Sequence, residues 1–170
     1  AENTLKIDRP FLVSIGCSAV YTKTYKMGNA EFSEVFVCQA VMRNVGRSPA
    51  LNSSILFMTG DFPNDENPEF PSAFEHPYTE IAVGPNMTRY SIGVPISVTT
   101  IEQVYLRERK LLAVLENSYK WMFSRDDYVE RSKYNIACIR FVKNPDGSAE
   151  ADLALYPVTD VASAGKIHGV

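Results

Sequence analysis

Residues 10–22 read Pro-Phe-Leu-Val-Ser-Ile-Gly-Cys-Ser-Ala-Val-Tyr-Thr, and the side chains of this stretch alternate in character. One parity carries the apolar and aromatic residues Phe11, Val13, Ile15, Cys17, Ala19 and Tyr21. The other parity is dominated by small and polar residues. Alternation over this length indicates a half-buried β-strand rather than a helix. The stretch therefore predicts that the chain is built from strands.

A second alternating run covers residues 32–44, and we predict that it pairs with residues 10–22 across a polar loop at 23–30. Residues 144–147, Asn-Pro-Asp-Gly, are the strongest turn signal, with proline placed for a type I turn and glycine for a left-handed conformation. Further runs with strand character are residues 51–59, 79–83, 87–96, 111–123, 134–143 and 149–156.

One short helix is expected near residues 100–110, because Thr99 and Glu102 match a capping box. The charged residues 107–110 would be its exposed end. We therefore predict a mainly β fold: an antiparallel β-sandwich, immunoglobulin-like or opened into a barrel, of seven to eight strands.

The expected domain organisation is simple. Residues 1–157 are expected to form a single β-sandwich domain. Residues 158–170, which are small and polar, are expected to form a loosely held C-terminal tail.

Charge and hydropathy argue against two classes of partner. The 170 residues include 17 Lys+Arg and 20 Asp+Glu, a formal net charge of −3. This balance argues against nucleic-acid binding, which normally requires a clustered basic excess. No uncharged stretch approaches the ~20 apolar residues of a membrane-spanning helix. Because the chain begins with Ala1 rather than Met, we expect that an upstream segment was removed and that membrane attachment uses a segment absent from this chain.

The sequence contains no motif that indicates catalysis. It has two histidines, His76 and His168, and we interpret His76 as a solvated loop residue. His-Glu-x-x-His, Gly-x-Ser-x-Gly and phosphate-binding glycine loops do not occur. We therefore expect no enzymatic activity and no cofactor, and we assign no catalytic, cofactor-binding or metal-binding residue.

The cysteines and the acidic residues each allow two interpretations. Cys17, Cys38 and Cys138 lack Cys-x-x-Cys spacing and are interpreted as buried thiols, with one disulfide plus one free thiol as the alternative. Residues 60–79 are rich in proline and predict a long exposed loop. The acidic part of this loop, residues 61–69, is interpreted as solvated, with a calcium site as the alternative.

An aromatic row is the other feature with two interpretations. Tyr119, Trp121 and Phe123 share one parity of a predicted strand, and residues 124–133 follow as a charged loop or a frayed turn of helix. We interpret the row as core packing. The alternative is a platform on which sugars stack.

Residues 43–50, Arg-Asn-Val-Gly-Arg-Ser-Pro-Ala, follow an apolar strand and resemble the Asn-x-Gly-x-x-Pro-Ala turn of extracytoplasmic β-sandwich domains. Such domains occur in poorly characterised bacterial inner-membrane proteins. Residues 8–13 and 119–126 are similar to a first strand and a later aromatic strand of these domains, although the glycine that usually opens the aromatic strand is missing.

Two residues of the 43–50 segment carry specific structural expectations. We expect Gly46 to adopt a positive φ and the Asn44 side chain to bond nearby backbone amides. The competing hypothesis is an anion-binding loop that uses Arg43 and Arg47.

The resemblance, together with the all-β pattern, the expected loss of an upstream segment and the lack of catalytic motifs, favours a non-catalytic sensing or protein-interaction domain of a membrane-anchored bacterial protein. It places the domain on the periplasmic or extracellular face of the inner membrane, with the cytoplasm as the alternative, and implies an unidentified protein partner. The alternative function is a small hydrolase or carbohydrate-binding domain that uses Tyr119, Trp121, Phe123 and the 61–69 loop. The sequence names no small-molecule ligand.

Overall fold

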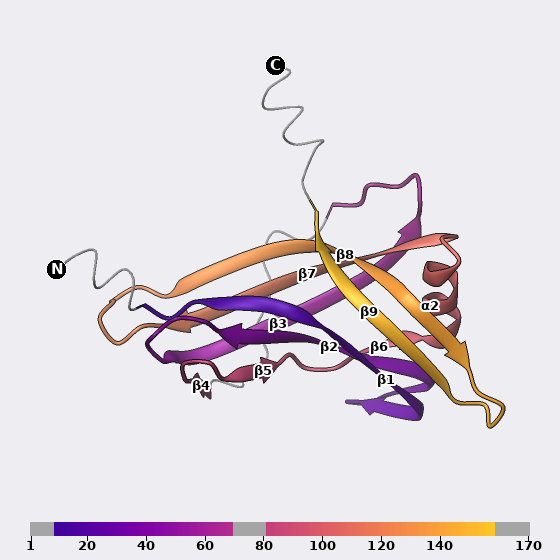
Figure 1. Cartoon of the computed structure of the whole chain (residues 1–170), viewed down its shortest axis with the longest axis horizontal. Helices are drawn as coiled ribbons and strands as arrows, with labels where there is room; N and C mark the ends of the chain where they lie inside the picture. The colour runs from indigo at the N-terminus through magenta and orange to yellow at the C-terminus, as the bar shows by residue number, and fades with distance from the viewer. Residues whose placement is uncertain (1–8, 70–80, 159–170) are drawn as a thin grey trace, which may run out of the picture.

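The computed structural model describes residues 9–69 and 81–158, which form one antiparallel sheet curled into a nearly closed barrel with one helix at an end (Figure 1). In chain order the elements are β1 (Leu12–Met27), β2 (Ala30–Asn44), β3 (Ala50–Pro63), β4 (Ile81–Val83), β5 (Thr88–Tyr90), β6 (Val94–Ser97), α2 (Val98–Tyr105), β7 (Arg109–Lys120), β8 (Tyr128–Lys143) and β9 (Ala149–Pro157). The strand order is β4-β3-β7-β8-β9-β1-β2-β5, and β6 also pairs with β2. The expected mainly β fold with one short helix is confirmed.

Strands β1 and β2 form the hairpin that the alternating runs predict, with a register from Leu12 opposite Asn44 to Met27 opposite Ala30. The expected loop at residues 23–30 is wrong, because both strands continue to a two-residue turn. Gly28 opens that turn with a φ of +62°, which glycine adopts without steric cost. The polar residues near the turn are the solvent-facing part of longer strands.

A β-bulge in β1 divides the alternating row that the sequence shows. The register against β2 shifts between Ser14 and Gly16, so Ile15 has no opposite residue. Cys17, after the bulge, packs against the core, whereas Phe11 and Ile15 are 39% and 48% exposed. A bulge inserts one residue and thereby moves the following side chains to the other face. The apolar residues that form one alternating row in the sequence therefore lie on opposite faces of β1 before and after the bulge.

The three strands β7, β8 and β9 follow one another as an antiparallel meander. Residues 144–147 turn as predicted: the Asn144 N–H donates to the Ser148 carbonyl at 2.8 Å, and Gly147 has a φ of +89°. The loop expected at residues 124–133 is largely wrong, because β8 already begins at Tyr128. Glu130, Arg131 and Lys133 therefore belong to a strand, whereas Arg125, Asp126 and Asp127 precede it.

Residues 87–96, expected as one strand, form β5 and β6, and this division gives nine described strands in place of seven to eight. Ser91 interrupts the run between them. Its N–H donates to the Ala40 carbonyl at 2.9 Å, and its Oγ accepts the Ala40 N–H at 2.9 Å. The Ser91 hydroxyl thus accepts the Ala40 N–H in place of a backbone carbonyl of a neighbouring strand.

Helix α2 covers one end of the barrel and places Ile101 and Val104 in the core (Figure 1). Its N-cap is Ser97, whose Oγ accepts the Thr100 N–H at 3.0 Å, so the expected capping box from Thr99 is wrong.

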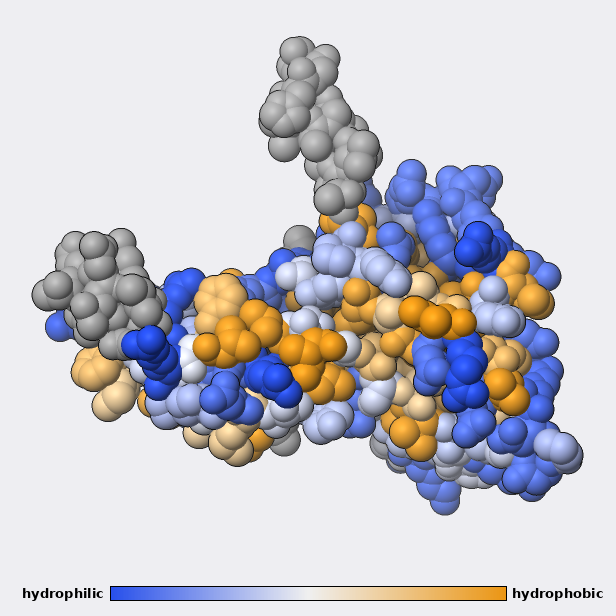
Figure 2. Space-filling view, in the orientation of Figure 1, coloured by the Kyte–Doolittle hydropathy of each residue, from blue (hydrophilic) through white to orange (hydrophobic). Residues whose placement is uncertain are grey.

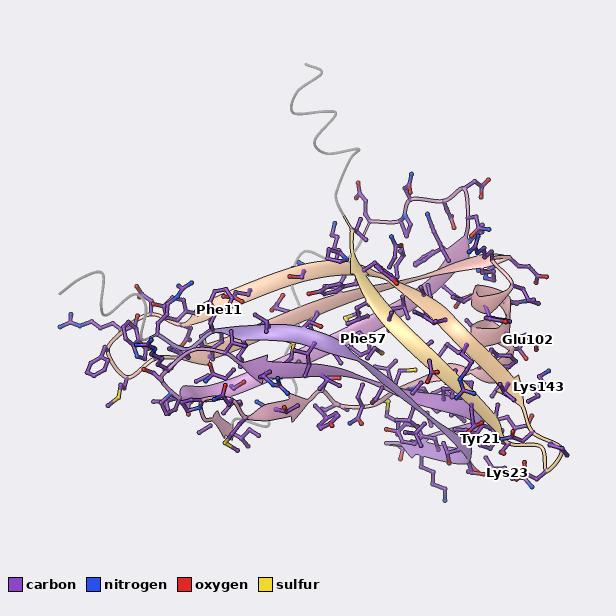
Figure 3. All side chains as sticks on the ribbon, viewed as in Figure 1. Phe11, Tyr21, Lys23, Phe57, Glu102 and Lys143 are labelled. Carbon is purple, nitrogen blue, oxygen red and sulfur yellow. The ribbon has the colours of Figure 1, made fainter. Side chains whose placement is uncertain are left out.

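Glu102, the other member of the expected capping box, has a different partner. Its carboxylate lies 2.8 Å from the Lys143 ammonium, which ties the helix to the end of β8 (Figure 3).

Candidate functional site

Asn44, the last residue of β2, is fully buried and joins three segments of the chain. Its Oδ1 accepts the N–H groups of Phe11 at 3.1 Å and Gly46 at 3.0 Å. Its Nδ2 donates to the carbonyls of Ser48 at 2.8 Å and Val83 at 2.9 Å. We call this set the Asn44 junction. The expectation that Asn44 bonds nearby backbone amides is confirmed, and the side-chain amide uses both its donors and its acceptor.

Gly46 belongs to the Asn44 junction for a reason other than the expected one. Positive φ among the described glycines occurs at Gly28 and Gly147, so the prediction for Gly46 is wrong. A Cβ at Gly46 would instead lie 2.2 Å from the Arg9 carbonyl oxygen and 2.7 Å from the Phe11 nitrogen. Glycine is required here because another stretch of backbone passes directly over it.

The boundary between β1 and β9 is held differently. In the described part of the chain, β1 pairs with β9 at one position only, Cys17 opposite Leu153. Bulges lie next to this bridge at residues 14–16 of β1 and at residues 138–140, where β8 pairs with β9. Bulges bend strands and increase their twist, which accounts for the loss of pairing on either side. We call this boundary of β1 with β9 and β8 the seam.

Strand β8 lies across the seam from β1 beyond the end of β9 (Figure 1). At the far end of the seam, the Arg9 guanidinium lies 5.3 Å from the centre of the Phe11 ring and 5.4 Å from that of Tyr128. Between Arg9 and the bridge, the strand pairings of the described residues give residues 12–16 of β1 and 128–130 of β8 no strand partner on their seam side. Two unpaired strand edges therefore border the seam.

The outer surface around the seam carries exposed apolar side chains. Figure 2 shows hydrophobic patches over the β1, β8 and β9 face of the barrel. The exposed large apolar residues of these three strands include Ile15, Val20, Val129, Ile139 and Tyr156. Exposed apolar surface beside an unpaired strand edge is typical of protein interaction sites.

The inner side of the seam carries two serines. Ser14 lies opposite Met42 on the core side of β1, and its buried Oγ has no hydrogen-bond partner among the residues that the structure describes. Ser132 lies opposite the core residue Leu115 and is nevertheless exposed. These two side chains therefore offer hydrogen bonds to a strand in the seam, whereas Leu12 and Tyr128, nearer to Arg9, pack in or against the core.

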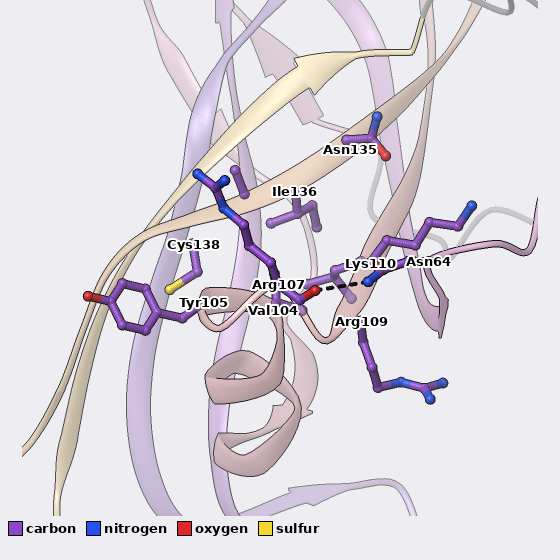
Figure 4. Close-up of a pocket in the computed structure, with 11 residues that line it drawn as sticks. Asn64, Val104, Tyr105, Arg107, Arg109, Lys110, Asn135, Ile136 and Cys138 are labelled. Atoms are coloured by element: carbon purple, nitrogen blue, oxygen red, sulfur yellow. Dashed lines mark hydrogen bonds between the residues drawn. The ribbon is translucent and has the colours of Figure 1, made fainter.

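A pocket of about 290 Å³ lies where α2 ends, against β7 and β8 (Figure 4). The charged residues 107–110, expected as the helix end, are a turn followed by the start of β7. This turn brings Arg107, Arg109 and Lys110 to the pocket, whose floor includes Leu111 and Ile136. The described lining contains no acidic residue. Sequence reasoning missed this pocket, because the basic residues were assigned to an exposed helix end.

The aromatic row does not persist as a row. Tyr119 is 1% exposed and Trp121 7%, whereas Phe123 lies beyond the end of β7 and is 65% exposed. The Tyr119 hydroxyl lies 3.1 Å from a carboxylate oxygen of Glu130, and burial is the main cause that raises its pKa. Trp121 and Phe123 meet edge to face at 5.4 Å. Core packing therefore describes Tyr119 and Trp121, and no exposed stacking surface joins all three.

The acidic segment 61–69 is divided between a strand and a loop. Asp61 belongs to β3, and its carboxylate lies 2.9 Å from the Arg109 guanidinium, so an exposed loop beginning at residue 60 is wrong. Leu111 pairs with Asp61 on β7, eight residues from Tyr119, which is roughly 27 Å along a strand. The two parts of the alternative carbohydrate or hydrolase site thus lie far apart. His76 and His168 lie outside the described residues.

All three cysteines are free thiols that pack in or against the core. Burial raises the pKa of Cys17 to about 12, and burial raises the pKa of Cys38 still further from its ordinary value. Burial is also the main cause that raises the pKa of Cys138, whose thiol donates to the Arg140 carbonyl at 3.2 Å. Thiols of this kind are poor nucleophiles.

Three comparisons give this chain no relative. No protein-family model, no curated protein and no solved structure matches it. Within the described residues, no group of three or more His, Cys, Asp or Glu side chains is placed to hold a metal ion. Helix α2, the helix that these residues contain, is too short to cross a membrane.

Proposed function

We propose that this chain is a non-catalytic protein-interaction domain that binds an extended segment of a partner protein by strand addition along the seam. The observation that carries the proposal is the pair of unpaired strand edges of β1 and β8. An exposed strand edge presents a row of N–H and C=O groups, and an extended peptide satisfies them by becoming a further strand.

The direction of one backbone bond shows which groups of β8 face the seam. The Val158 N–H donates to the Lys133 carbonyl at 3.0 Å, on the side of β8 that faces β9. In an antiparallel strand, the N–H and C=O of every second residue point to the same side. The backbone groups of Val129 therefore point into the seam, whereas those of Ser132 point toward β7.

The side chains beside the seam define the partner segment. On the outer face the added strand would contact Ile15 and Val129, which are exposed and apolar. On the inner face it would meet Ser14 and Ser132. The segment that fits is one in which apolar residues alternate with serine, threonine or asparagine.

We also propose that the domain belongs to a membrane-anchored bacterial protein and acts on the periplasmic or extracellular face of the inner membrane. The resemblance of residues 43–50 supports this location, and the Asn44 junction explains why such a turn would specify a fold. Alkaline phosphatase fused to the natural protein after Val170 is expected to be active. Fluorescence of a green fluorescent protein fused at the same place, with inactive phosphatase, would assign the domain to the cytoplasm.

The test of strand addition is selection of a display library of random linear peptides on the full chain. The selected peptides are expected to alternate apolar residues with serine, threonine or asparagine. They are also expected to bind the Val129→Ala variant, because alanine keeps the backbone N–H of residue 129. They should bind Val129→Pro about tenfold more weakly, because proline removes one hydrogen bond. Phe123→Ala is the control for exposed apolar surface elsewhere.

Two outcomes would overturn strand addition. One is equal binding of the selected peptides to Val129→Ala and Val129→Pro. The other is peptide binding that appears only after residues 159–170 are deleted, because the chain itself would then supply the strand.

A further inference from the structure

Helix α2 ends in a backbone motif that normally selects glycine. The Glu108 N–H donates to the Gln103 carbonyl at 2.9 Å, and the Arg107 N–H to the Val104 carbonyl at 3.1 Å. These two bonds define a Schellman motif, in which the residue after the C-cap is left-handed and is usually glycine. Here that residue is Arg107, with a φ of +61°. An arginine at this position carries a conformational cost that glycine avoids.

The side chain of Arg107 lies at the pocket. Figure 4 shows it extending from the helix end toward β8 and Cys138, whereas Arg109 is directed away. The Asn64 amide donates to the Arg107 carbonyl at 2.8 Å and so holds the turn in place. Arg107 has no ion-pair partner among the described residues, in contrast to Arg109, which pairs with Asp61 at 2.9 Å.

The remainder of the pocket suits a ligand with two parts. Lys110 lies at the rim, where its ammonium donates to Asn67 at 3.2 Å. Val104, Leu111 and Ile136 provide apolar surface beneath. A small pocket with an apolar floor and a few charged groups at one side is the usual form of a small-molecule site. In a chain of net charge −3, the absence of acidic residues from this lining further favours an anion.

We propose that this pocket binds a small organic oxyanion, a carboxylate or a phosphate monoester on an apolar body, and that the Arg107 guanidinium contacts the oxyanion. The planar guanidinium matches both groups through two parallel hydrogen bonds. The apolar body lies against Leu111 and Ile136. This site is separate from the edge proposed for strand addition, because its β8 lining is residues 135–138, whereas that edge is residues 128–130.

The experiment measures binding of three probes to the full chain by calorimetry: benzoate, phenyl phosphate and benzamide. Benzamide has the shape of benzoate without its charge. At least one of the two anions is expected to bind at least tenfold more tightly than benzamide, and the stronger one identifies the class of oxyanion. Equal affinity for all three, or no binding of either anion, would overturn the proposal.

The decisive variant is Arg107→Gly, which removes the cation and supplies the residue that the motif prefers. It is expected to lose anion binding by at least tenfold while its melting temperature rises by about 2 °C. Arg125→Gly removes an exposed arginine from another loop and is the matched control, with anion binding unchanged. Full anion binding by Arg107→Gly would overturn the assignment of Arg107, and so would an equal loss in Arg125→Gly.

Discussion

The Asn44 junction and the seam close two sides of the same barrel by different means. At the junction, one buried side chain makes four hydrogen bonds to the backbone of other segments. At the seam, β1 and β9 share one bridge, and apolar side chains remain exposed on the outside. The difference teaches that this sheet is tightly specified where chain segments cross and sparsely paired along the seam, where we propose that a further strand is added.

The largest expected effect is at the centre of the junction. Asn44→Ala removes four hydrogen bonds that a fully buried side chain makes to the backbone, so we expect it to lower the free energy of unfolding by about 3–5 kcal/mol. Chemical denaturation measures this. Asn67→Ala, at an exposed loop, is the control and should change stability by less than about 0.5 kcal/mol. A loss below about 1 kcal/mol for Asn44→Ala would show that the junction is not what closes this side.

A matched pair of glycines makes the same comparison without removing a hydrogen bond. Gly46→Ala places a Cβ against the backbone of Arg9 and Phe11 and should cost about 2–3 kcal/mol. Gly16→Ala, beside the seam, meets nothing within 4 Å and should be nearly neutral. Thermal melts of the two variants are the measurement. Equal losses of stability in the two variants would mean that the Asn44 junction and the seam are packed alike.

A pair of prolines compares the two edges of β8. Ser132→Pro removes an N–H that faces β7, and we expect it to cost about 2 kcal/mol more than Val129→Pro, whose N–H faces the seam. Chemical denaturation of the two variants measures this as the difference between their midpoint denaturant concentrations, provided that their m-values are equal. If Val129→Pro proves as costly as Ser132→Pro, the seam edge of β8 is already paired.

The smallest effect is on reactivity rather than stability. A thiol of pKa about 12 is almost wholly protonated at pH 8, so Cys17 should react with iodoacetamide roughly 1,000-fold more slowly than free cysteine. Cys38, deeper in the core, should react more slowly still. Mass spectrometry of each cysteine peptide over time measures this. Identical rates for Cys17 and Cys38 would indicate that both become accessible only by global unfolding, and that the seam does not open separately.

Alternation predicts the fold class because successive side chains of a strand point to opposite faces, so a half-buried strand alternates apolar and polar residues. The β1–β2 hairpin and the turn at residues 144–147 were predictable for this reason. The parity change at Ile15 was not, because a bulge depends on how two strands meet. The sequence predicts correctly that glycine is required at position 46, but the expected reason, a positive φ, is wrong. The actual reason is the close approach of the Arg9–Phe11 backbone, and a contact between distant segments leaves no local pattern in the sequence.

The candidate sites were less accessible to sequence reasoning. The pocket depends on where α2 ends, and Arg107 carries no turn signal because the motif normally shows glycine. The seam depends on the sparse pairing of β1 with β9, which is limited to one bridge within the described residues and joins distant parts of the sequence. Tyr119, Trp121 and Phe123 shared a parity, yet the strand ends before Phe123, so sequence alone grouped residues that the structure separates.

The bridge between Cys17 and Leu153 also bears on the order of folding. The β1–β2 hairpin and the β7–β8–β9 meander are built from contacts that are local in the sequence, whereas this bridge joins strands near opposite ends of the chain. Contacts between distant segments carry the largest loop-closure entropy and form slowly. We expect the seam to be the last boundary to form as the chain folds, so a nascent molecule would expose its β1 edge longest and would then be most open to pairing with another chain.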